Sequence, residues 1–481
     1  MWRFLMLNLV GRIVLACMLF SGPVWAACTG SSPTWTSTPD RTSVASCVSS
    51  ATYGDTINVS AASETTWTSQ LVITKNVKLI GPGAGSLTIK AGFTSTNGTV
   101  ATDANFLILY TPDATTRAAD GEFRISGFTF NMDSRCMLFK AKNTTSTFMT
   151  QTRFDNCIVN NTTGRTLAIE GNIGGVIYKN IFNATYLVMS IYGNNSNWQY
   201  LTHSPGNQYN IFFEDNVVTT SDTPHDAGLG CNGVIRYNTY TANDGVYPWI
   251  DFHGNQASAG NTATMGSEVY GNNITVTNND GSWIDLRGGQ GIVYYNNMNT
   301  SSSDVKVYAM EEYNDNLEDY PTASDGQPQH VSESYMFTNF RNNTTYINPT
   351  ITTTVDYGGE IGIVPQFNID VWRQYGTYSG ESGVGCGPLG SRPATCTEGT
   401  AYWATDQSCT NMTGLVGAST DVTGGTRTPT TYLTGILYIC GSSNWTNATT
   451  YTPYTYPHPL RGEVAVPTSA TNLRMTNTGL R

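Results

Sequence analysis

Short runs of alternating apolar and polar residues recur through the middle of the chain, and most of them end at an asparagine. Alternation with a period of two is typical of β-strands. Successive asparagines at these ends are separated by 25, 24, 36, 22, 34 and 24 residues. A recurring period in this range is typical of solenoids, in which each repeat forms one coil. The pattern therefore predicts one strand per coil, ending at Asn131, Asn156, Asn180, Asn216, Asn238, Asn272 and Asn296.

A second series of strand-like runs lies between the members of the first. It comprises LAIEG at 167, MSIYG at 189, WIDFHG at 249, WIDLRG at 283 and VYAMEE at 307. Two alternating series with short steps of 22–25 residues predict stacked coils of parallel strands, and the longer steps predict coils that carry a loop. We expect the asparagines to form a ladder at one corner. An asparagine side chain can bond its copy in the next coil, and asparagine tolerates the left-handed backbone of a sharp bend.

This pattern resembles the right-handed parallel β-helix of the pectate lyase-like superfamily, over about residues 41–345. The stretch 41–85 is similar to the opening of that fold, with a short capping helix, a Gly-Asp-Thr-Ile turn and first coils that close at 80–83. A cap is required because an uncovered coil exposes its core and its strand edges. The resemblance implies an all-β protein, a right-handed parallel β-helix (solenoid) with an N-terminal cap. A small disulfide-stapled C-terminal module is expected to follow it.

The N-terminus is typical of a secretory signal. Arg3 and Arg12 precede an apolar run, and Val24-Trp25-Ala26 supplies a small-residue cleavage site. Cys28 after Ala26-Ala27 leaves a lipoprotein site open as an alternative, although Trp25 stands where such sites prefer leucine. No later run is long and apolar enough to span a membrane, so we expect a secreted or cell-surface protein. The predicted units are a signal peptide (1–26), the β-helix (27–375), a cysteine-containing module (376–461) and a tail or truncated start of another module (462–481).

Export would remove Cys17 with the signal peptide and makes the nine later cysteines candidates for disulfides. Proximity in the sequence predicts a Cys28–Cys47 bond and a Cys136–Cys157 bond. Cys231 is isolated, and we expect it to stay unpaired. Three connectivities remain open among the last four cysteines, which are Cys386, Cys396, Cys409 and Cys440.

Composition narrows the range of partners. The chain has 35 Asp and Glu against 24 Lys and Arg, a net charge of −11, and no basic run. An acidic surface repels phosphates, so nucleic acid is set aside as a partner. The chain also has 27 Tyr, 17 Phe and 10 Trp, many more aromatic residues than a disordered chain carries.

Candidate chemistry comes from two copies of one motif. YPWIDFHGN begins at 247 and GSWIDLRGG begins at 281. Strand alternation turns Ile250 and Phe252 of the first copy inward. The predicted outward positions are Trp249, Asp251 and His253 in the first copy, and Trp283, Asp285 and Arg287 in the second.

Neighbouring coils extend this polar strip. The preceding coil offers HDAGLG, which brings His225 and Asp226 close, and the following coil offers Tyr308 and Glu311. Like charges on adjacent coils destabilise a sheet, so a repeated aspartate needs a cation, an arginine or a substrate beside it. Exposed tryptophans are common platforms for the apolar face of a sugar ring.

Lyases of the superfamily that the chain resembles cleave uronate-containing polysaccharides by β-elimination. By that resemblance, Arg287 would neutralise the sugar carboxylate and His253 would be the base. Asp251 and Asp285 would orient these groups or hold a divalent cation such as Ca²⁺, although no metal ligand set is assigned. The residues expected to bind substrate are Trp249, Trp283, His225, Asp226, Tyr308 and Glu311.

Two alternatives to elimination stay open, namely hydrolysis and glycan binding without catalysis. Hydrolysis needs two carboxyl groups, and those on adjacent coils would lie about 5 Å apart, near the separation of retaining glycosidases. The chain also lacks a clear match to the calcium-binding aspartates of the superfamily's lyases and to the aspartate cluster of its hydrolases. We therefore predict a secreted lyase or glycosidase that acts on an extracellular polysaccharide. The alternative is a non-catalytic adhesin or glycan-binding repeat protein.

Overall fold

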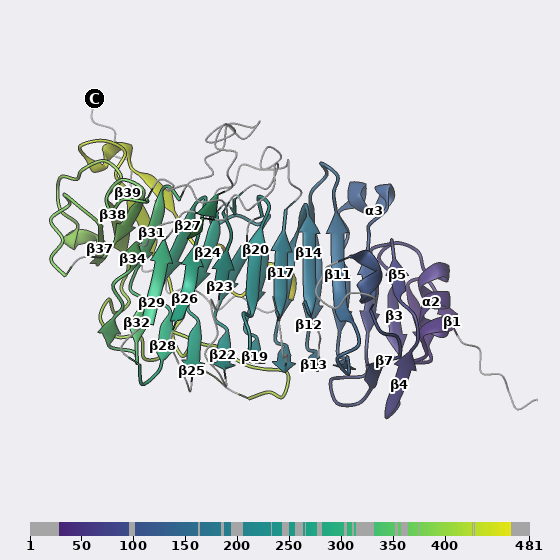
Figure 1. The fold of residues 1–481 in the computed structure, drawn as a ribbon. Helices are drawn as coiled ribbons and strands as arrows, with labels where there is room; N and C mark the ends of the chain where they lie inside the picture. Colours follow the sequence, from purple (N-terminus) through teal and green to yellow (C-terminus); the bar gives the residue numbers. More distant parts are fainter. Residues whose placement is uncertain are drawn as a thin grey trace, which may run out of the picture.

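The chain winds into a parallel β-helix with three long sheets running side by side along its axis (Figure 1). This computed structural model describes residues 28–462, except 96–101, 162–163, 184–186, 194–204, 232, 243–249, 255–262, 265, 277–280, 303–304, 310–311, 314–330, 352–354, 357–363, 375, 426 and 428. Each coil gives one strand to sheet A, then one to sheet B, then one to sheet C. The predicted fold class, a right-handed parallel β-helix, is confirmed.

Sheet A has 13 strands and is parallel apart from its first pair. Its strands are β1 (Cys28–Ser31), β2 (Thr34–Ser37), β3 (Thr56–Val59), β6 (Lys78–Ile80), β9 (Phe123–Ser126), β12 (Met149–Asp155), β15 (Ile173–Tyr178), β18 (Ile211–Glu214), β21 (Gly233–Arg236), β24 (Ser267–Tyr270), β27 (Gly291–Tyr294), β31 (Ser334–Phe337) and β36 (Val371–Arg373).

Sheets B and C have 11 and 10 strands. Sheet B contains β4 (Glu64–Trp67), β7 (Thr88–Ala91), β10 (Thr129–Asn131), β13 (Ile158–Asn160), β16 (Ile181–Asn183), β19 (Val217–Thr220), β22 (Thr239–Ala242), β25 (Asn273–Val276), β28 (Asn297–Asn299), β32 (Phe340–Arg341) and β33 (Thr345–Tyr346). Sheet C contains β5 (Leu71–Ile73), β8 (Phe106–Tyr110), β11 (Met137–Asn143), β14 (Leu167–Gly171), β17 (Met189–Tyr192), β20 (His225–Gly228), β23 (Ile250–Phe252), β26 (Gly281–Leu286), β29 (Val305–Ala309) and β34 (Thr350–Ile351).

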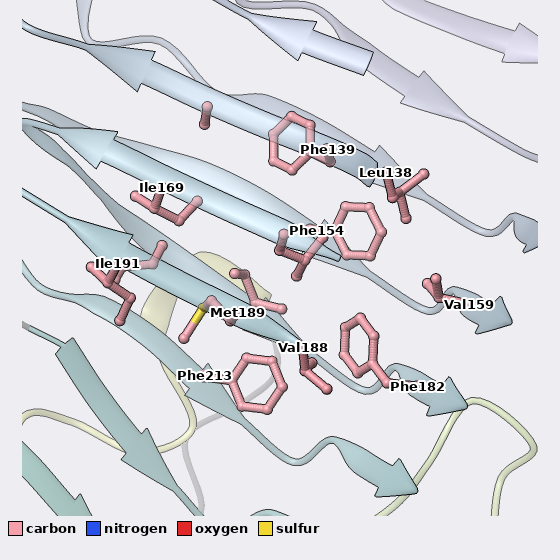
Figure 2. Close-up of a cluster of buried hydrophobic side chains, with 14 of the residues drawn as sticks. Leu138, Phe139, Phe154, Val159, Ile169, Phe182, Val188, Met189, Ile191 and Phe213 are labelled. Atoms are coloured by element: carbon pink, nitrogen blue, oxygen red, sulfur yellow. The ribbon is translucent and has the colours of Figure 1, made fainter. Parts of the chain in front are cut away.

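The hydrophobic core fills the space between the three sheets. Figure 2 shows part of it, where side chains from successive coils lie above one another. Phe139 and Phe154 have ring centroids 5.8 Å apart, and Phe182 and Phe213 have centroids 5.6 Å apart. The rings of each pair come from different sheets and meet across the core. Within one sheet, in-register pairing sets Ile169 beside Ile191 on the next coil. The remaining labelled core residues are Leu138, Val159, Val188 and Met189.

The predicted asparagine ladder forms at the corner between sheets A and B. The Nδ2 and backbone N of Asn238 both donate to Oδ1 of Asn272, at 3.0 Å each. The preceding residue, Tyr237, has the left-handed φ of 57°, so the bend falls one residue before the asparagine. The ladder is fully buried and consists of Asn180, Asn216, Asn238, Asn272, Asn296 and Asn339.

The prediction is wrong for two members of the series. Strand pairing sets Asp155 opposite Tyr178, which puts Cys157 rather than Asn156 at the level of Asn180. The backbone N of Cys157 donates to Oδ1 of Asn180 at 2.9 Å. Asn131 ends β10 and faces outward on sheet B. The ladder therefore starts later than the sequence pattern indicates.

The N-terminal cap is present as predicted. Helix α2 (Arg41–Ser50) begins at Asp40, whose side chain accepts a hydrogen bond from the backbone N of Ser43 at 2.9 Å. Its buried face packs on the first coil, and the Cys28–Cys47 disulfide ties it to β1. The other short elements are α3 (Ala114–Ala119), η1 (Asp103–Asn105), β30 (Glu312–Tyr313) and β35 (Val355–Asp356).

The predicted Cys136–Cys157 disulfide is wrong, because both cysteines are unpaired and buried. They lie about one coil apart in the sequence, but Cys136 precedes a strand of sheet C and Cys157 lies at the corner between sheets A and B. Cys231 is unpaired, as predicted. The last four cysteines pair as Cys386–Cys409 and Cys396–Cys440.

The C-terminal module packs on the outer face of sheet A through a second hydrophobic cluster. Trp403 lies 5.1 Å from Tyr294 and 5.7 Å from Phe337, measured between ring centroids. The module is therefore stabilised by the β-helix as well as by its disulfides. Its elements are β37 (Val384–Gly387), η4 (Leu389–Ser391), β38 (Ala401–Ala404), β39 (Ile436–Ile439), η5 (Trp445–Asn447), β40 (Thr449–Tyr451) and η6 (Pro459–Arg461).

Ionic contacts fix the end of the module to sheet A. Arg461 binds Glu214 and Asp215 at 2.9 and 2.5 Å, and the Nε of Arg236 donates to Glu214 at 2.7 Å. Arg236 also donates to the carbonyl oxygens of residues 454 and 455. We call Glu214, Asp215, Arg236 and Arg461 the C-terminal clamp. Burial acts to raise the pKa of Glu214, but the charges of Arg236 and Arg461 outweigh it and lower the pKa to about 2.

The ladder predicts an unequal response to removing two asparagines. Asn238→Ala should destabilise the protein by about 2–4 kcal/mol, because it leaves buried hydrogen-bonding groups of the neighbouring coils unpaired. Asn183→Ala is the matched control, since Asn183 is exposed on sheet B and should cost less than about 0.5 kcal/mol. Urea unfolding followed by tryptophan fluorescence measures both. Equal midpoints for the two variants would contradict the ladder's role.

The clamp predicts a pH-dependent difference between the wild type and Glu214→Gln. The pKa of Glu214 is lower in the folded chain than its ordinary value of 4.5, so its stabilisation is complete above that value and is lost as the pH falls toward 2. The gap in unfolding free energy between the two proteins should therefore narrow as the pH falls from 4.5 toward 2. Denaturation at several pH values measures the gap, and a gap that is constant across this range would refute the prediction.

Candidate functional site

The candidate site lies on the outer face of sheet C, where β20, β23 and β26 run side by side (Figure 1). Strand pairing places Asp226 opposite Asp251, and Asp251 opposite Asp285. Continuing this register by two residues puts His253 beside Arg287. Ile250 and Phe252 point into the core, so the predicted alternation of this motif is confirmed. The result is three aspartates on consecutive coils with an imidazole and a guanidinium next to them.

Arg287 joins the second copy of the motif to the first. Its Nε donates to Oδ1 of Asp251 at 2.7 Å, and its Nη2 donates to Oδ2 of the same carboxylate. The same Nη2 lies 2.8 Å from Nδ1 and 2.9 Å from Nε2 of His253. The guanidinium therefore compensates the charge of Asp251 and lies against the imidazole.

His253 lies between two carboxylates. Its Nε2 is 3.0 Å from Oδ1 of Asp226 and 3.2 Å from Oδ2 of Asp251. On the far side, the hydroxyl of Tyr192 donates to Oδ2 of Asp226, and the Nη2 of Arg165 donates to the Tyr192 oxygen at 2.8 Å. We call this chain of contacts the sheet C network, formed by Arg165, Tyr192, Asp226, Asp251, His253 and Arg287.

The network is shielded from solvent but not sealed. The side chains of Asp251, Arg287, Asp226 and His253 are 9, 10, 12 and 15% exposed. Burial acts to raise the pKa of Asp226, but the hydrogen bond and charge of His253, the Tyr192 hydroxyl and the charge of Arg165 outweigh it and lower the pKa to about 2. Burial and the charge of Asp226 raise the pKa of Tyr192.

Three members of the network have the donor atoms of a metal site. Asp226, Asp251 and His253 each offer one ligand atom, and these atoms all lie within 4.8 Å of one another. Carboxylate oxygen and imidazole nitrogen are ordinary ligands of divalent transition metals.

The structure brings together most of the polar residues proposed from the sequence. Asp226, Asp251, His253 and Arg287 are in contact, and Asp285 is stacked beside Asp251. The proposal that His225 borders the strip is wrong. Its side chain points into the core, where Nε2 lies 2.7 Å from the Tyr240 hydroxyl, because consecutive strand residues face opposite sides.

The structure does not place the side chains of the aromatic candidates or of Glu311. Trp249 and Glu311 lie outside the described residues. Trp283 belongs to β26 and Tyr308 to β29, but their side chains also fall outside the description. Their proposed roles in binding substrate stay predictions.

The sequence reasoning missed Arg165 and Tyr192. Tyr192 is the fourth residue of MSIYG, a run assigned to the second strand series. Aligning this run with the later coils would have placed Tyr192 in the column of His253. Arg165 lies in the turn before β14, where no strand pattern indicates its direction.

We found no match to a protein-family model, to a curated protein or to a solved structure. Within the described part of the chain, no helix combines the length and the apolar character needed to cross a membrane.

Proposed function

We propose that this protein is a secreted or cell-surface enzyme that cleaves an acidic, uronate-containing polysaccharide at the outer face of sheet C. The proposal rests on one observation, the imidazole of His253 held between two carboxylates of neighbouring coils with a guanidinium against it. Ionisable groups gathered in a partly shielded site are typical of catalytic centres. The three disulfides are consistent with an oxidising compartment.

The charges favour elimination over hydrolysis. A glycosidase needs one carboxyl group that keeps its proton until it protonates the leaving oxygen. Asp226 has a pKa lowered to about 2, and Asp251 accepts two hydrogen bonds from Arg287. The pKa of Asp226 is too low for that acid, and both oxygens of Asp251 are bonded to Arg287, so neither residue is suited to the role. His253 is the better candidate for moving a proton near neutral pH.

In β-elimination, a base removes the proton on the carbon next to the sugar carboxylate. The electron pair of that C–H bond forms a carbon–carbon double bond, the bond to the leaving sugar oxygen breaks, and that oxygen takes up a proton. We assign the base to His253, oriented by Asp226 and Asp251. The negative charge that develops beside the sugar carboxylate needs cations, and Arg165 and Arg287 lie at the two ends of the network.

A second charged cluster lies on the same face of sheet C and is balanced within itself, with two lysines paired to two carboxylates. Lys140 and Lys142 lie on β11, earlier along sheet C, and both contact Asp103 and Glu170. Paired strands are roughly 4.8 Å apart, so these lysines are three coils, or about 15 Å, from Asp226 along the sheet. A polysaccharide lying along the axis would pass both groups.

A rival function, glycan binding without cleavage, is favoured by a different observation. Asp251 is already paired with Arg287, and Asp226 is already bonded to Tyr192. A network whose groups bond one another does not require chemistry, and a polar surface of this kind also suits an adhesin.

The proposal predicts that cleavage depends on His253. The chain is incubated with uronate-containing and neutral polysaccharides, while the absorbance of unsaturated product and the reducing ends are both recorded. We expect both signals to rise, and His253→Gln to lower the rate at least about 100-fold, since the base is lost. Asn183→Ala, on sheet B, is the control and should keep the wild-type rate.

Other results would point elsewhere. Reducing ends without unsaturated product would indicate hydrolysis. Glycan binding without turnover across the panel would favour the rival function.

A further inference from the structure

We propose that the sheet C network also binds a divalent transition-metal ion, with Asp226 Oδ1, Asp251 Oδ2 and His253 Nε2 as its ligands and the Arg287 guanidinium displaced. Metal binding is argued from the geometry of these residues alone. Its effect on cleavage rests on the proposed function.

The ligand atoms are already close to the spacing that one ion requires. The Nε2 of His253 is 3.0 and 3.2 Å from the two carboxylate oxygens. Zinc-like ions bind nitrogen and oxygen at about 2.0–2.2 Å, which sets neighbouring ligand atoms about 3–3.5 Å apart. Once the Arg287 guanidinium is displaced, the site needs only a closer approach of the two carboxylate oxygens, which lie within 4.8 Å of each other.

The fold holds the carboxylates in place from behind. Asp226 and Asp251 are directly paired on β20 and β23, and His253 follows the end of β23. The second oxygen of Asp226 accepts from the Tyr192 hydroxyl, whose oxygen in turn accepts from Arg165. Outer hydrogen bonds of this kind orient ligands toward a metal.

A cationic group already occupies the position that the ion would take. The Nη2 of Arg287 contacts Oδ2 of Asp251 and lies within 2.9 Å of both ring nitrogens of His253. The carboxylates of Asp226 and Asp251 face Nε2, so a proton on this nitrogen points at them, and a metal must displace that proton to bind Nε2. Because the ion and the guanidinium would use the same oxygen and the same ring, they must compete.

The donor set also indicates the class of metal. Ca²⁺ takes six to eight oxygen ligands, and Mg²⁺ also binds through oxygen. One imidazole nitrogen with two carboxylate oxygens suits Zn²⁺, Mn²⁺, Co²⁺ or Fe²⁺ better. The inferred ion therefore differs from the calcium considered from the sequence.

Metal binding should inhibit the proposed cleavage. An ion on Nε2 withdraws electron density from the imidazole, so the other ring nitrogen, Nδ1, becomes a weaker base. The ion also binds the two carboxylates that orient the ring. Under the proposed function, the metal therefore weakens the base and engages the carboxylates that orient it.

The test is calorimetric titration of the chain from Ala27, without an affinity tag, using ZnCl₂ and, separately, CaCl₂. We expect one zinc site in the wild type, at least about tenfold tighter binding in Arg287→Gln, and at least about 100-fold weaker binding in His253→Gln. Calcium should bind more weakly than zinc. Unchanged zinc binding in His253→Gln, or no binding by either the wild type or Arg287→Gln, would overturn the proposal.

A second probe, together with a folding check, distinguishes the loss of a metal ligand from misfolding of the variant. Co²⁺ bound by nitrogen and oxygen ligands absorbs visible light, so the wild type should develop a band that Asp226→Asn and His253→Gln lack. Thermal unfolding of each variant without metal checks the fold. A full-strength cobalt band in either folded variant would also refute the ligand assignment.

The outcomes separate this inference from the proposed function. Calorimetry needs no polysaccharide, so a chain that binds zinc and cleaves nothing would keep the metal site and refute the enzyme. A chain that cleaves polysaccharide but binds no zinc would keep the enzyme and refute the metal site. Where both hold, Zn²⁺ should inhibit cleavage and a chelator should restore it.

Discussion

In-register pairing of parallel strands, one coil on the next at roughly 4.8 Å, is the constraint on which the whole structure depends. It brings like residues together whatever their chemistry. For Ile169 and Ile191 the result is a continuous core, and for Asn238 and Asn272 it is a hydrogen-bonded ladder. For Asp226, Asp251 and Asp285 the same pairing places like charges side by side, which a sheet tolerates only with compensation. The sheet C network follows from that requirement.

Two outer faces of the helix carry dense ionic networks, and their burial separates their roles. In the C-terminal clamp, Glu214 and Arg236 are fully buried beneath the module, so no ligand reaches them. The sheet C side chains of Asp226 and His253 keep 12 and 15% of their surface exposed. The clamp holds two parts of the chain together, whereas the sheet C network retains access to solvent and hence to ligands.

The sequence predicts what repeats and misses what does not. Period-two alternation and two matching motifs are enough to place Asp251, His253 and Arg287 on one face, because pairing carries each position into the next coil. The same rule places His225 inside, and the proposal for that residue failed because Asp226 next to it was assigned to the same face.

Features fixed by tertiary contact left no periodic signal. The Cys136–Cys157 pairing failed because nearness in the sequence does not show which corner of the coil a residue occupies. Arg165 lies in a turn and follows neither strand series. The contact between Glu214 and Arg461 joins residues 247 positions apart, and no pattern in the chain connects them.

Arg287 is the residue on which the behaviour of the sheet C network depends. With His253 neutral, the charges of Arg165 and Arg287 balance those of Asp226 and Asp251, so the network is neutral without any ligand. An acidic sugar that approaches it must compete with Asp251 for the guanidinium, while a metal ion must compete with the guanidinium for Asp251. Both kinds of ligand thus act on the same ion pair from opposite sides. The free energy needed to separate Arg287 from Asp251 therefore limits the affinity of each.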